Sequence, residues 1–124
     1  DADNFKLIND NFGHEVGDQA LELLAEICRS ALAPEHQTAR VGGEEFLIIL
    51  PDTDKAQAYK IAQALVLTVC NSNFSQFPQG FSMTISAGVA SLMSSDDKLS
   101  QLLKRADDAL YLAKSEGRNQ ARVS

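Results

Sequence analysis

The sequence predicts an α/β sandwich in which a mixed central sheet is flanked by helices. Three observations predict this class. Segments with helical periodicity alternate with short β-branched and apolar segments along the chain. Glycine and proline stand between several of these segments, where elements usually begin and end. The 124 residues are 44% hydrophobic and 23% charged, which suits one globular domain with a single core.

Two helices are expected in the first quarter of the chain. Phe5–Phe12 has a helical pattern, and Gly13 is placed to end it. A longer helix is expected from Glu15 or Val16 to Ala33, and Pro34 breaks its pattern. Its apolar stripe comprises Ala20, Leu24, Ile27 and Ala31, with Leu21, Cys28 and Leu32 beside it.

A hairpin, a helix and a strand are expected next. Residues 37–41 and 46–50 are predicted antiparallel strands joined by a glycine-rich turn. The next helix is expected after Pro51-Asp52-Thr53, with the Asp or the Thr as its cap. Residues 81–91 are β-branched and apolar enough for a buried strand. The stripe of the helix comprises Ala58, Ile61, Ala62, Leu65 and Val69.

The chain is expected to close on a helix and a short strand. Leucine and alanine recur at helical spacing between residues 99 and 113, and Gly117 is placed to end that helix. A short last strand is expected over residues 120–123. The stripe of the helix comprises Leu99, Leu102, Leu103, Ala106, Leu110 and Ala113.

Charge and cysteine content narrow the classes of function. The net charge of −6 argues against the basic footprint of a nucleic-acid-binding protein but leaves room for a nucleotide. The apolar runs are too short to span a membrane, and no signal-peptide pattern is visible. A cytoplasmic domain without direct membrane contact is therefore expected, even if a parent protein is membrane-anchored. Cys28 and Cys70 are expected as reduced core residues, although a disulfide stays open.

The most informative feature is the run Gly42-Gly43-Glu44-Glu45-Phe46 between the two strands of the predicted hairpin. Alone, such a run is more often a solvated turn. Adjacent carboxylates repel each other unless a cation or a proton relieves them. Glycine lets a ligand approach closely, and two hard oxygen ligands beside it suit a divalent metal ion that carries a phosphate.

Asp1, Glu44 and Glu45 are the candidate metal ligands. Magnesium usually combines one or two carboxylates with substrate phosphates, and manganese fits an all-oxygen site equally well. Two such ions could activate an attacking hydroxyl and stabilise a leaving pyrophosphate. The candidate phosphate clamps are Lys6, Lys114 and Arg118, although a lone Lys or Arg is more often a surface cation.

Asn9 and Asp18 are the candidate base-reading residues. A carboxylate can accept from the N1–H and amino groups of guanine, and an amide can donate and accept there. Alone, Asp18 is more often a residue that favours a helix start. His14 is a weaker candidate, and neither histidine has the companions that a zinc site needs.

Three motifs in order resemble those of the GGDEF domains, the diguanylate cyclases. The first 18 residues are similar to the family's D-x-D-x-F-K-x-x-N-D-x-x-G-H-x-x-G-D stretch, running from Asp1 to Asp18. The hairpin turn is the GGEEF form of the family signature. Residues 106–119 resemble the closing A-D-x-A-L-Y-x-A-K-x-x-G-R-N. The resemblance implies the fold of nucleotidyl cyclases and polymerase palm domains, and condensation of two GTP into cyclic di-GMP with release of two pyrophosphates.

The resemblance also assigns roles, position by position. Asp1 and Glu45 would bind two metal ions with help from the Ala2 carbonyl, and Glu44 would contact metal and help deprotonate the 3′-hydroxyl. Guanine and phosphate contacts would come from the remaining matched positions. These are Asn9 and Asp18 for the base, Lys6, Lys114 and Arg118 for the phosphates, main-chain groups at Asn4 and Phe5, and Gly42 and Gly43 in the turn.

By resemblance, each domain would bind one GTP, so catalysis would need a homodimer held by an upstream sensory or dimerisation domain. Two departures from the family pattern stand out. The R-x-x-D inhibition positions hold Ala33 and His36, so feedback inhibition through that site is not expected. The family's strand and helix before the first motif are not within residues 1–124, which are expected to form a single domain lacking them.

Two other functions stay open. A catalytically silent GGDEF domain could sense GTP or dock a partner, although silent members usually lose part of the signature. Another nucleotidyl cyclase on the same fold is the third possibility, and Asn9 and Asp18 favour guanine over adenine.

Overall fold

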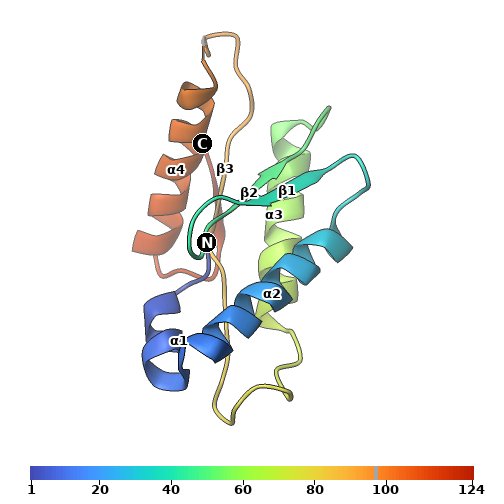
Figure 1. Ribbon diagram of the computed structural model, residues 1–124. Helices are drawn as coiled ribbons and strands as arrows, with labels where there is room; N and C mark the ends of the chain where they lie inside the picture. Colours follow the sequence, from blue (N-terminus) through green and yellow to red (C-terminus); the bar gives the residue numbers. More distant parts are fainter. Residues whose placement is uncertain (97) are drawn as a thin grey trace.

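The computed structural model describes residues 1–96 and 98–124 (Figure 1). Helices and strands alternate along the chain in the order α1, α2, β1, β2, α3, β3, α4, β4. The helices are α1 Phe5–Phe12, α2 His14–Ala31, α3 Lys55–Cys70 and α4 Leu99–Ser115. The strands are β1 Gln37–Arg40, β2 Phe46–Ile49, β3 Ala87–Val89 and β4 Ala121–Val123. Among the described residues no helix is long and apolar enough to cross a membrane.

Both parallel and antiparallel strand pairs occur, as expected for a mixed α/β fold. In the antiparallel hairpin of β1 and β2, Arg40 lies opposite Phe46. In the parallel pair of β3 and β4, Ala87 lies opposite Ala121. Residues 1–3 lie between the two pairs, because Ala2 forms an antiparallel bridge with Ile85 and also bonds to the hairpin turn. Figure 1 shows the N-terminus between the hairpin and β3.

Helices cover the strands on both sides. Both α3 and α4 pack against β3 and β4, while α2 packs against α1 and α3. The approach of α4 to β3 is very close at Gly88. A Cβ atom added there would lie 2.1 Å from the Ala106 carbonyl oxygen and 2.4 Å from the Leu110 backbone nitrogen. Only glycine fits that position, so Gly88 sets the distance between strand and helix.

The core joins the inner faces of α1, α2 and α3 to the extended segment before β3. The stripe predicted for α2 is confirmed at Ala20, Leu21, Leu24 and Cys28, whereas Ala31 is exposed. Four aromatic rings form a cluster in or beside the core, and the ring centroids of Phe77 and Phe81 are 4.4 Å apart. The rings are those of Phe12, Phe74, Phe77 and Phe81. The buried core cluster consists of Ala2, Ile8, Ala20, Leu21, Leu24, Cys28, Leu65, Val66, Val69, Phe81, Met83, Ile85 and Ala121.

Two helix boundaries differ from the sequence prediction. Gly13, with φ of 91°, ends α1 and begins α2 at once, so α2 starts at His14 rather than at Glu15 or Val16. It ends at Ala31 rather than Ala33, because Leu32 is already extended ahead of the proline-containing turn.

The cap of α3 is Asp54 and not Asp52 or Thr53. The Asp54 carboxylate accepts from the Gln57 backbone N–H at 2.8 Å, and the Gln57 side chain accepts from the Asp54 N–H at 3.3 Å. This reciprocal capping box satisfies two helix-end donors together, which explains why the helix begins one residue later than expected.

The strand predicted over residues 81–91 is paired over Ala87–Val89 and at Ile85 alone. Phe81, Met83 and Ile85 are buried while Ser82 is exposed, so the segment has the alternation of a strand. The pairing partners are residues 1–3 on one side and β4 on the other.

The cysteine prediction is correct at one position only. Cys28 and Cys70 are both free thiols, and Cys28 is buried. Burial raises the pKa of the Cys28 thiol, so it stays protonated and inert. Cys70, the last residue of α3, is exposed because it lies beside the apolar stripe and not on it; the preceding stripe residue, Val69, is fully buried.

Candidate active site

The site is built around residues 1–3, which lie between the hairpin turn and the C-terminal end of α4. The Asp1 side chain is 3% exposed and forms an ion pair with Lys114, Oδ2 to Nζ, at 3.1 Å. The backbone of Asp1 is fixed by the Ser86 N–H, which donates to the Asp1 carbonyl at 3.0 Å. The structure therefore brings together a candidate metal ligand and a candidate phosphate clamp.

The GGEE turn is held against this segment by backbone hydrogen bonds. The Ala2 N–H donates to the Glu44 carbonyl at 3.2 Å. The turn itself is closed by the Val41 N–H, which donates to the Glu45 carbonyl at 3.0 Å. Glu44 is half-buried and Glu45 is exposed, so their carboxylates differ in access to solvent. Asp1 and Glu44 thus lie on neighbouring segments, as a shared metal site would require.

Arg40 is a residue of this turn that the sequence analysis did not single out. Its Nε donates to the carbonyls of Gly43 at 2.9 Å and Gly42 at 3.3 Å. These two bonds hold the carbonyl groups of the glycines in place. The glycines have no side chains that could pack and hold the turn in another way. A guanidinium two residues before a double glycine is the signal that could have identified it.

The donor chemistry around Asp1 fits a hard divalent cation. Asp1, Glu44 and Glu45 supply carboxylates, and among the described residues no backbone N–H donates to the Ala2 carbonyl oxygen. Oxygen donors of this kind are those that Mg²⁺ and Mn²⁺ prefer. Within residues 1–96 and 98–124 no three acidic, histidine or cysteine side chains are already gathered tightly enough to hold a metal ion. The ligand types are therefore present, while the side chains are not preassembled.

The first turn of α1 offers backbone donors beside these carboxylates. Its cap residue, Asn4, has φ of 52° and makes no side-chain capping bond. The first helical hydrogen bond runs from the Ile8 N–H to the Asn4 carbonyl, so within the described residues the preceding N–H groups, including that of Phe5, have no helical partner. Lys6 is exposed on the same turn. Unpaired N–H groups and a lysine at a helix N-terminus favour an anion.

The candidate base readers lie where α1 meets α2. The Asn9 Oδ1 atom is buried and has no hydrogen-bond partner in the part of the chain that the structure describes. A Cβ atom on Gly17 would lie 1.9 Å from that oxygen and 3.2 Å from the ring of Phe5. Glycine at 17 is therefore what admits the Asn9 side chain, and exposed Asp18 is the next residue along α2. A buried acceptor without a donor is the feature expected of a group that awaits a ligand.

The third candidate clamp, Arg118, lies in the loop after α4. Three consecutive residues there have positive φ, namely Gly117 at 119°, Arg118 at 64° and Asn119 at 49°. The Arg118 side chain is exposed, and its N–H donates to the Ala113 carbonyl at 2.9 Å, closing the helix end. The loop places Arg118 and Lys114 at the same end of α4.

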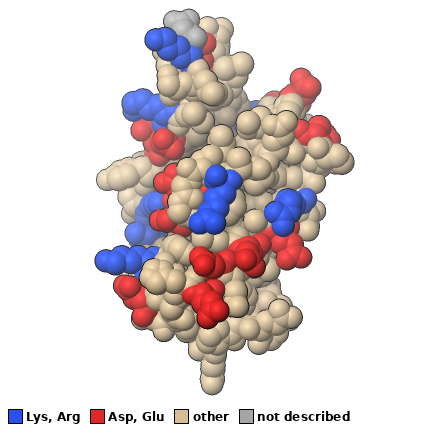
Figure 2. All heavy atoms as spheres, in the orientation of Figure 1, with Lys and Arg blue, Asp and Glu red and all other residues tan. Residues whose placement is uncertain are grey.

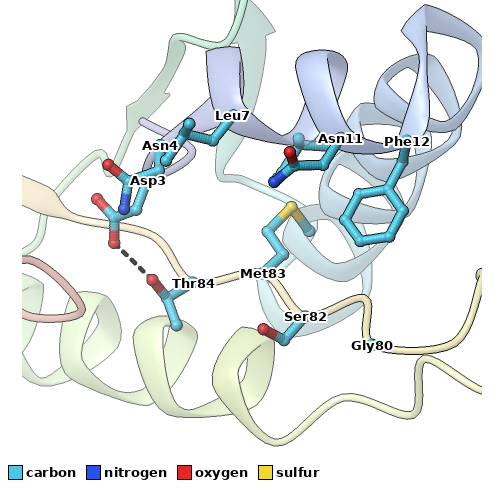
Figure 3. A pocket seen from close by; sticks show the side chains of 10 residues that line it. Asp3, Asn4, Leu7, Asn11, Phe12, Gly80, Ser82, Met83 and Thr84 are labelled. Atoms are coloured by element: carbon cyan, nitrogen blue, oxygen red, sulfur yellow. Dashed lines mark hydrogen bonds between the residues drawn. The ribbon is translucent and has the colours of Figure 1, made fainter.

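A hollow of about 280 Å³ lies between α1 and the segment before β3 (Figure 3). Of the predicted site residues only Asn4 lines it, so it is distinct from the site assembled above. Its residues are Asp3, Asn4, Leu7, Ile8, Asn11, Phe12, Gly80, Ser82, Met83 and Thr84. Asp3, at its edge, is 4% exposed and accepts hydrogen bonds from Thr84, Ser86 and Asn119. From the sequence, Asp3 was expected only as one position of the first motif.

Charges of both signs are interspersed over the face of the molecule that carries the hairpin. Figure 2 shows Lys and Arg side chains next to Asp and Glu side chains, without a broad basic area on this face.

Comparison with known proteins identifies relatives along almost the whole chain. The family model "Diguanylate cyclase, GGDEF domain" matches residues 1–120. A diguanylate cyclase of Vibrio cholerae is 42% identical over 119 residues, which cover 96% of this chain and 36% of that protein. Diguanylate cyclase DgcM of Escherichia coli is 40% identical, with 96% of this chain and 28% of that protein covered. The chain thus spans about a third of the length of these curated relatives.

Solved structures give the same result for the fold. The active GGEEF domain of a diguanylate cyclase from Vibrio cholerae matches with a TM-score of 0.93 and 41% identity, covering 99% of this chain and 78% of that chain. The coiled coil and GGDEF domain of DgcB from Caulobacter crescentus, solved in complex with c-di-GMP, matches with a TM-score of 0.91 and 29% identity. That match covers 100% of this chain and 66% of the DgcB chain. The predicted fold class and the family resemblance are confirmed.

Proposed function

This chain belongs to the GGDEF diguanylate cyclase family, and we propose that it is the catalytic domain that condenses two GTP into cyclic di-GMP. In each of two steps, the 3′-hydroxyl of one GTP attacks the α-phosphorus of the other, and pyrophosphate leaves. The observation that carries the proposal is the bond from the Ala2 N–H to the Glu44 carbonyl, which sets Asp1 beside the GGEE turn. Carboxylates from both segments can then act at one phosphate.

The metal site would use carboxylates from both segments. Asp1 and Glu45, with the Ala2 carbonyl, would hold two divalent cations, Mg²⁺ or Mn²⁺, and Glu44 would contribute to one of them. When bound, such ions lower the pKa of an attacking hydroxyl and neutralise charge on a leaving pyrophosphate. Glu44 would accept the proton of the 3′-hydroxyl. Gly43 leaves room at the turn, since an added Cβ there would meet nothing within 4 Å.

The nucleotide would be held at three places. The triphosphate would lie against the N–H groups of Asn4 and Phe5 and the side chains of Lys6, Lys114 and Arg118. The uncapped first turn of α1 supports this placement. The guanine would be read by Asn9 and Asp18, and the unpartnered Asn9 Oδ1 supports that assignment. Gly42, whose added Cβ would lie 3.5 Å from Glu45, would let the nucleotide approach the turn.

Catalysis would require two copies of the domain. One site holds one GTP, so the two sites must face each other in a symmetric homodimer before either 3′-hydroxyl can attack. An upstream sensory or dimerisation domain would bring them together by raising their effective concentration. The solved DgcB chain includes a coiled coil beside its GGDEF domain, which supports this arrangement. SiaD of Pseudomonas aeruginosa was solved with an activator, an example of control by a partner.

Residues 1–124 would form one domain whose sheet continues with a strand and a helix upstream of Asp1. Residues 1–3 already bond to the hairpin on one side and to residues 84–86 on the other. A strand that continues this segment would lie between β2 and β3 and unite the two strand pairs.

Feedback inhibition through the R-x-x-D positions would be absent. Ala33 and His36 bond to each other instead, because the Ala33 N–H donates to His36 Nδ1 at 3.1 Å and the His36 N–H donates to the Ala33 carbonyl at 3.0 Å. Neither supplies the arginine or aspartate that would bind the product.

A catalytically silent domain that senses GTP or docks a partner is the alternative. It is favoured by the absence, within the described residues, of a preassembled group of three metal-binding side chains. Glu44→Gln distinguishes the two functions, because it removes the proton acceptor and keeps the shape of the side chain. A cyclase would lose about 100-fold or more in turnover, whereas a sensor would keep its GTP affinity.

The experiment uses the chain extended upstream by its natural sequence and joined to a dimeric coiled coil. It is incubated with GTP and Mg²⁺, and cyclic di-GMP is measured by mass spectrometry beside the Glu44→Gln variant. Product from the unsubstituted protein alone supports the cyclase. GTP binding without product supports the sensor or docking module, and equal use of ATP would contradict the guanine assignment.

A further inference from the structure

We propose that Asp3 is a positioning residue that holds the loop of Arg118 in the shape needed to bind the triphosphate. The proposal rests on the function proposed above. Asp3 is 4% exposed, and its carboxylate accepts three hydrogen bonds. The donors are the Thr84 hydroxyl at 2.7 Å, the Ser86 hydroxyl at 2.6 Å and the Asn119 backbone N–H at 3.0 Å. Figure 3 shows the bond to Thr84 at the edge of the hollow.

A buried carboxylate here needs a reason, because burial of a charge costs free energy unless strong bonds compensate. Three charge-assisted hydrogen bonds provide that compensation. Two of the donors are hydroxyls from the segment before β3, which packs in the core. The third comes from a loop 116 residues away in sequence. Asp3 therefore connects the rigid core to the loop that follows α4.

That loop has a conformation that needs support. Arg118 and Asn119 both have positive φ, a backbone conformation that is unfavourable for L-residues because the Cβ atom crowds the backbone. The Arg118 N–H is held by the Ala113 carbonyl at the end of α4. The next N–H, that of Asn119, is held by Asp3. Arg118 is thus fixed on both sides, while its side chain stays exposed.

Residues 1–3 make two contacts near the C-terminal end of α4, one from Asp1 and one from Asp3. Asp1 forms an ion pair with Lys114, and Asp3 bonds to Asn119, so both carboxylates face the C-terminal end of α4. Together these contacts fix the distance between the metal-binding segment and two of the phosphate clamps. Loss of the Asp3 bond would let the loop relax to negative φ and move Arg118 away from the triphosphate.

The test measures binding, by calorimetry with Mg²⁺, of GMP and of a GTP analogue with a methylene group between the α- and β-phosphorus. Asp3→Ala should weaken the analogue about 10- to 100-fold, the range for one lost charge-assisted bond, and change GMP affinity less than threefold. Asp3→Asn should restore much of the affinity, because its amide oxygen can still accept from Asn119. Ser86→Ala is the matched control, since it removes another bond to Asp3 and leaves the loop contact intact.

A double-mutant cycle distinguishes a role of Asp3 in positioning Arg118 from a general loss of structure around Asp3. If Asp3 acts through Arg118, Arg118→Ala should add little to the loss already caused by Asp3→Ala. Additive losses, or equal losses for GMP and the analogue, would overturn the proposal. If Asp3→Ala does not fold, as judged by its melting curve, the same cycle is run with Asp3→Leu, which fills the space of the Asp3 side chain but cannot accept from the Asn119 N–H. If the analogue binds but GTP yields no cyclic di-GMP, the cyclase is refuted and the role of Asp3 is not, while absence of analogue binding refutes both.

Discussion

Gly17→Ala is expected to remove guanine recognition while leaving the fold intact. The added Cβ would lie 1.9 Å from Asn9 Oδ1, and Cβ contacts are essentially never found below 3.0 Å, so the oxygen must retreat by about 1.1 Å. A hydrogen bond of ordinary length to the base would then exceed 3.5 Å and be lost. Loss of a bond that leaves a buried group unsatisfied costs about 1–3 kcal/mol. GTP affinity should therefore fall about 10- to 100-fold.

The stability of this variant should change little. Alanine in place of glycine in a helix gains up to about 1 kcal/mol in the free energy of unfolding. The displaced Asn9 side chain costs about 0.5–1.5 kcal/mol if it leaves its rotamer. The two effects oppose each other, so the melting temperature should stay within a few degrees of that of the unsubstituted protein.

Calorimetry with the same methylene GTP analogue and Mg²⁺ measures the affinity, and a thermal melt measures the stability. Gln19→Ala controls for the change in helix propensity, since Gln19 is exposed on the same helix. Asn9→Ala should match the loss seen in Gly17→Ala, and the two together should lose no more than either alone. If Gly17→Ala binds the analogue within twofold of the unsubstituted protein, Asn9 is not the base reader.

Three other outcomes are expected. Gly88→Ala should lower the free energy of unfolding by about 3 kcal/mol or more, because backbone atoms of α4 occupy the place of the added Cβ, and Tm should drop by roughly 10 °C. An unchanged Tm would mean that α4 can shift away from β3. Arg40→Ala should lower kcat about tenfold with little change in Tm, because the GGEE turn loses two exposed hydrogen bonds. An unchanged kcat would show that the turn keeps its conformation without Arg40. Iodoacetamide should alkylate exposed Cys70 in the native state and Cys28 only after unfolding, because Cys28 is buried and burial raises the pKa of its thiol. Mass spectrometry with and without urea counts the alkylated cysteines, and equal alkylation rates for the two would contradict the burial of Cys28.

Most helices and strands could be predicted because their limits are marked locally. Phe5–Phe12 is confirmed at both ends, since Gly13 takes a positive φ that other residues avoid. The cap of α3 was wrong by one residue, because three neighbouring residues there are able to cap and only Asp54 meets a Gln three residues later. The extent of pairing in residues 81–91 depends on segments distant in sequence, which no local pattern encodes.

The residues of the candidate site also fall into two groups, those that a local sequence pattern reveals and those that it does not. Glu44, Glu45 and the lysines could be named as candidates from the sequence because their residue types stand in recognisable motifs. Asp3 and Arg40 were missed because their partners are backbone groups or hydroxyls. Any residue can supply a backbone donor, so composition and spacing do not reveal such contacts.

The contacts of Asp1 and Asp3 give the first motif a physical reason. Residues two apart in an extended segment face the same side, and here that side is the C-terminal end of α4. The residue between them, Ala2, is 2% exposed and faces the core. The partners, Lys114 and Asn119, are the first and last residues of the closing K-x-x-G-R-N motif. The two motifs are therefore joined by direct contacts, and a change in the position of either should move the carboxylates and the candidate phosphate clamps together.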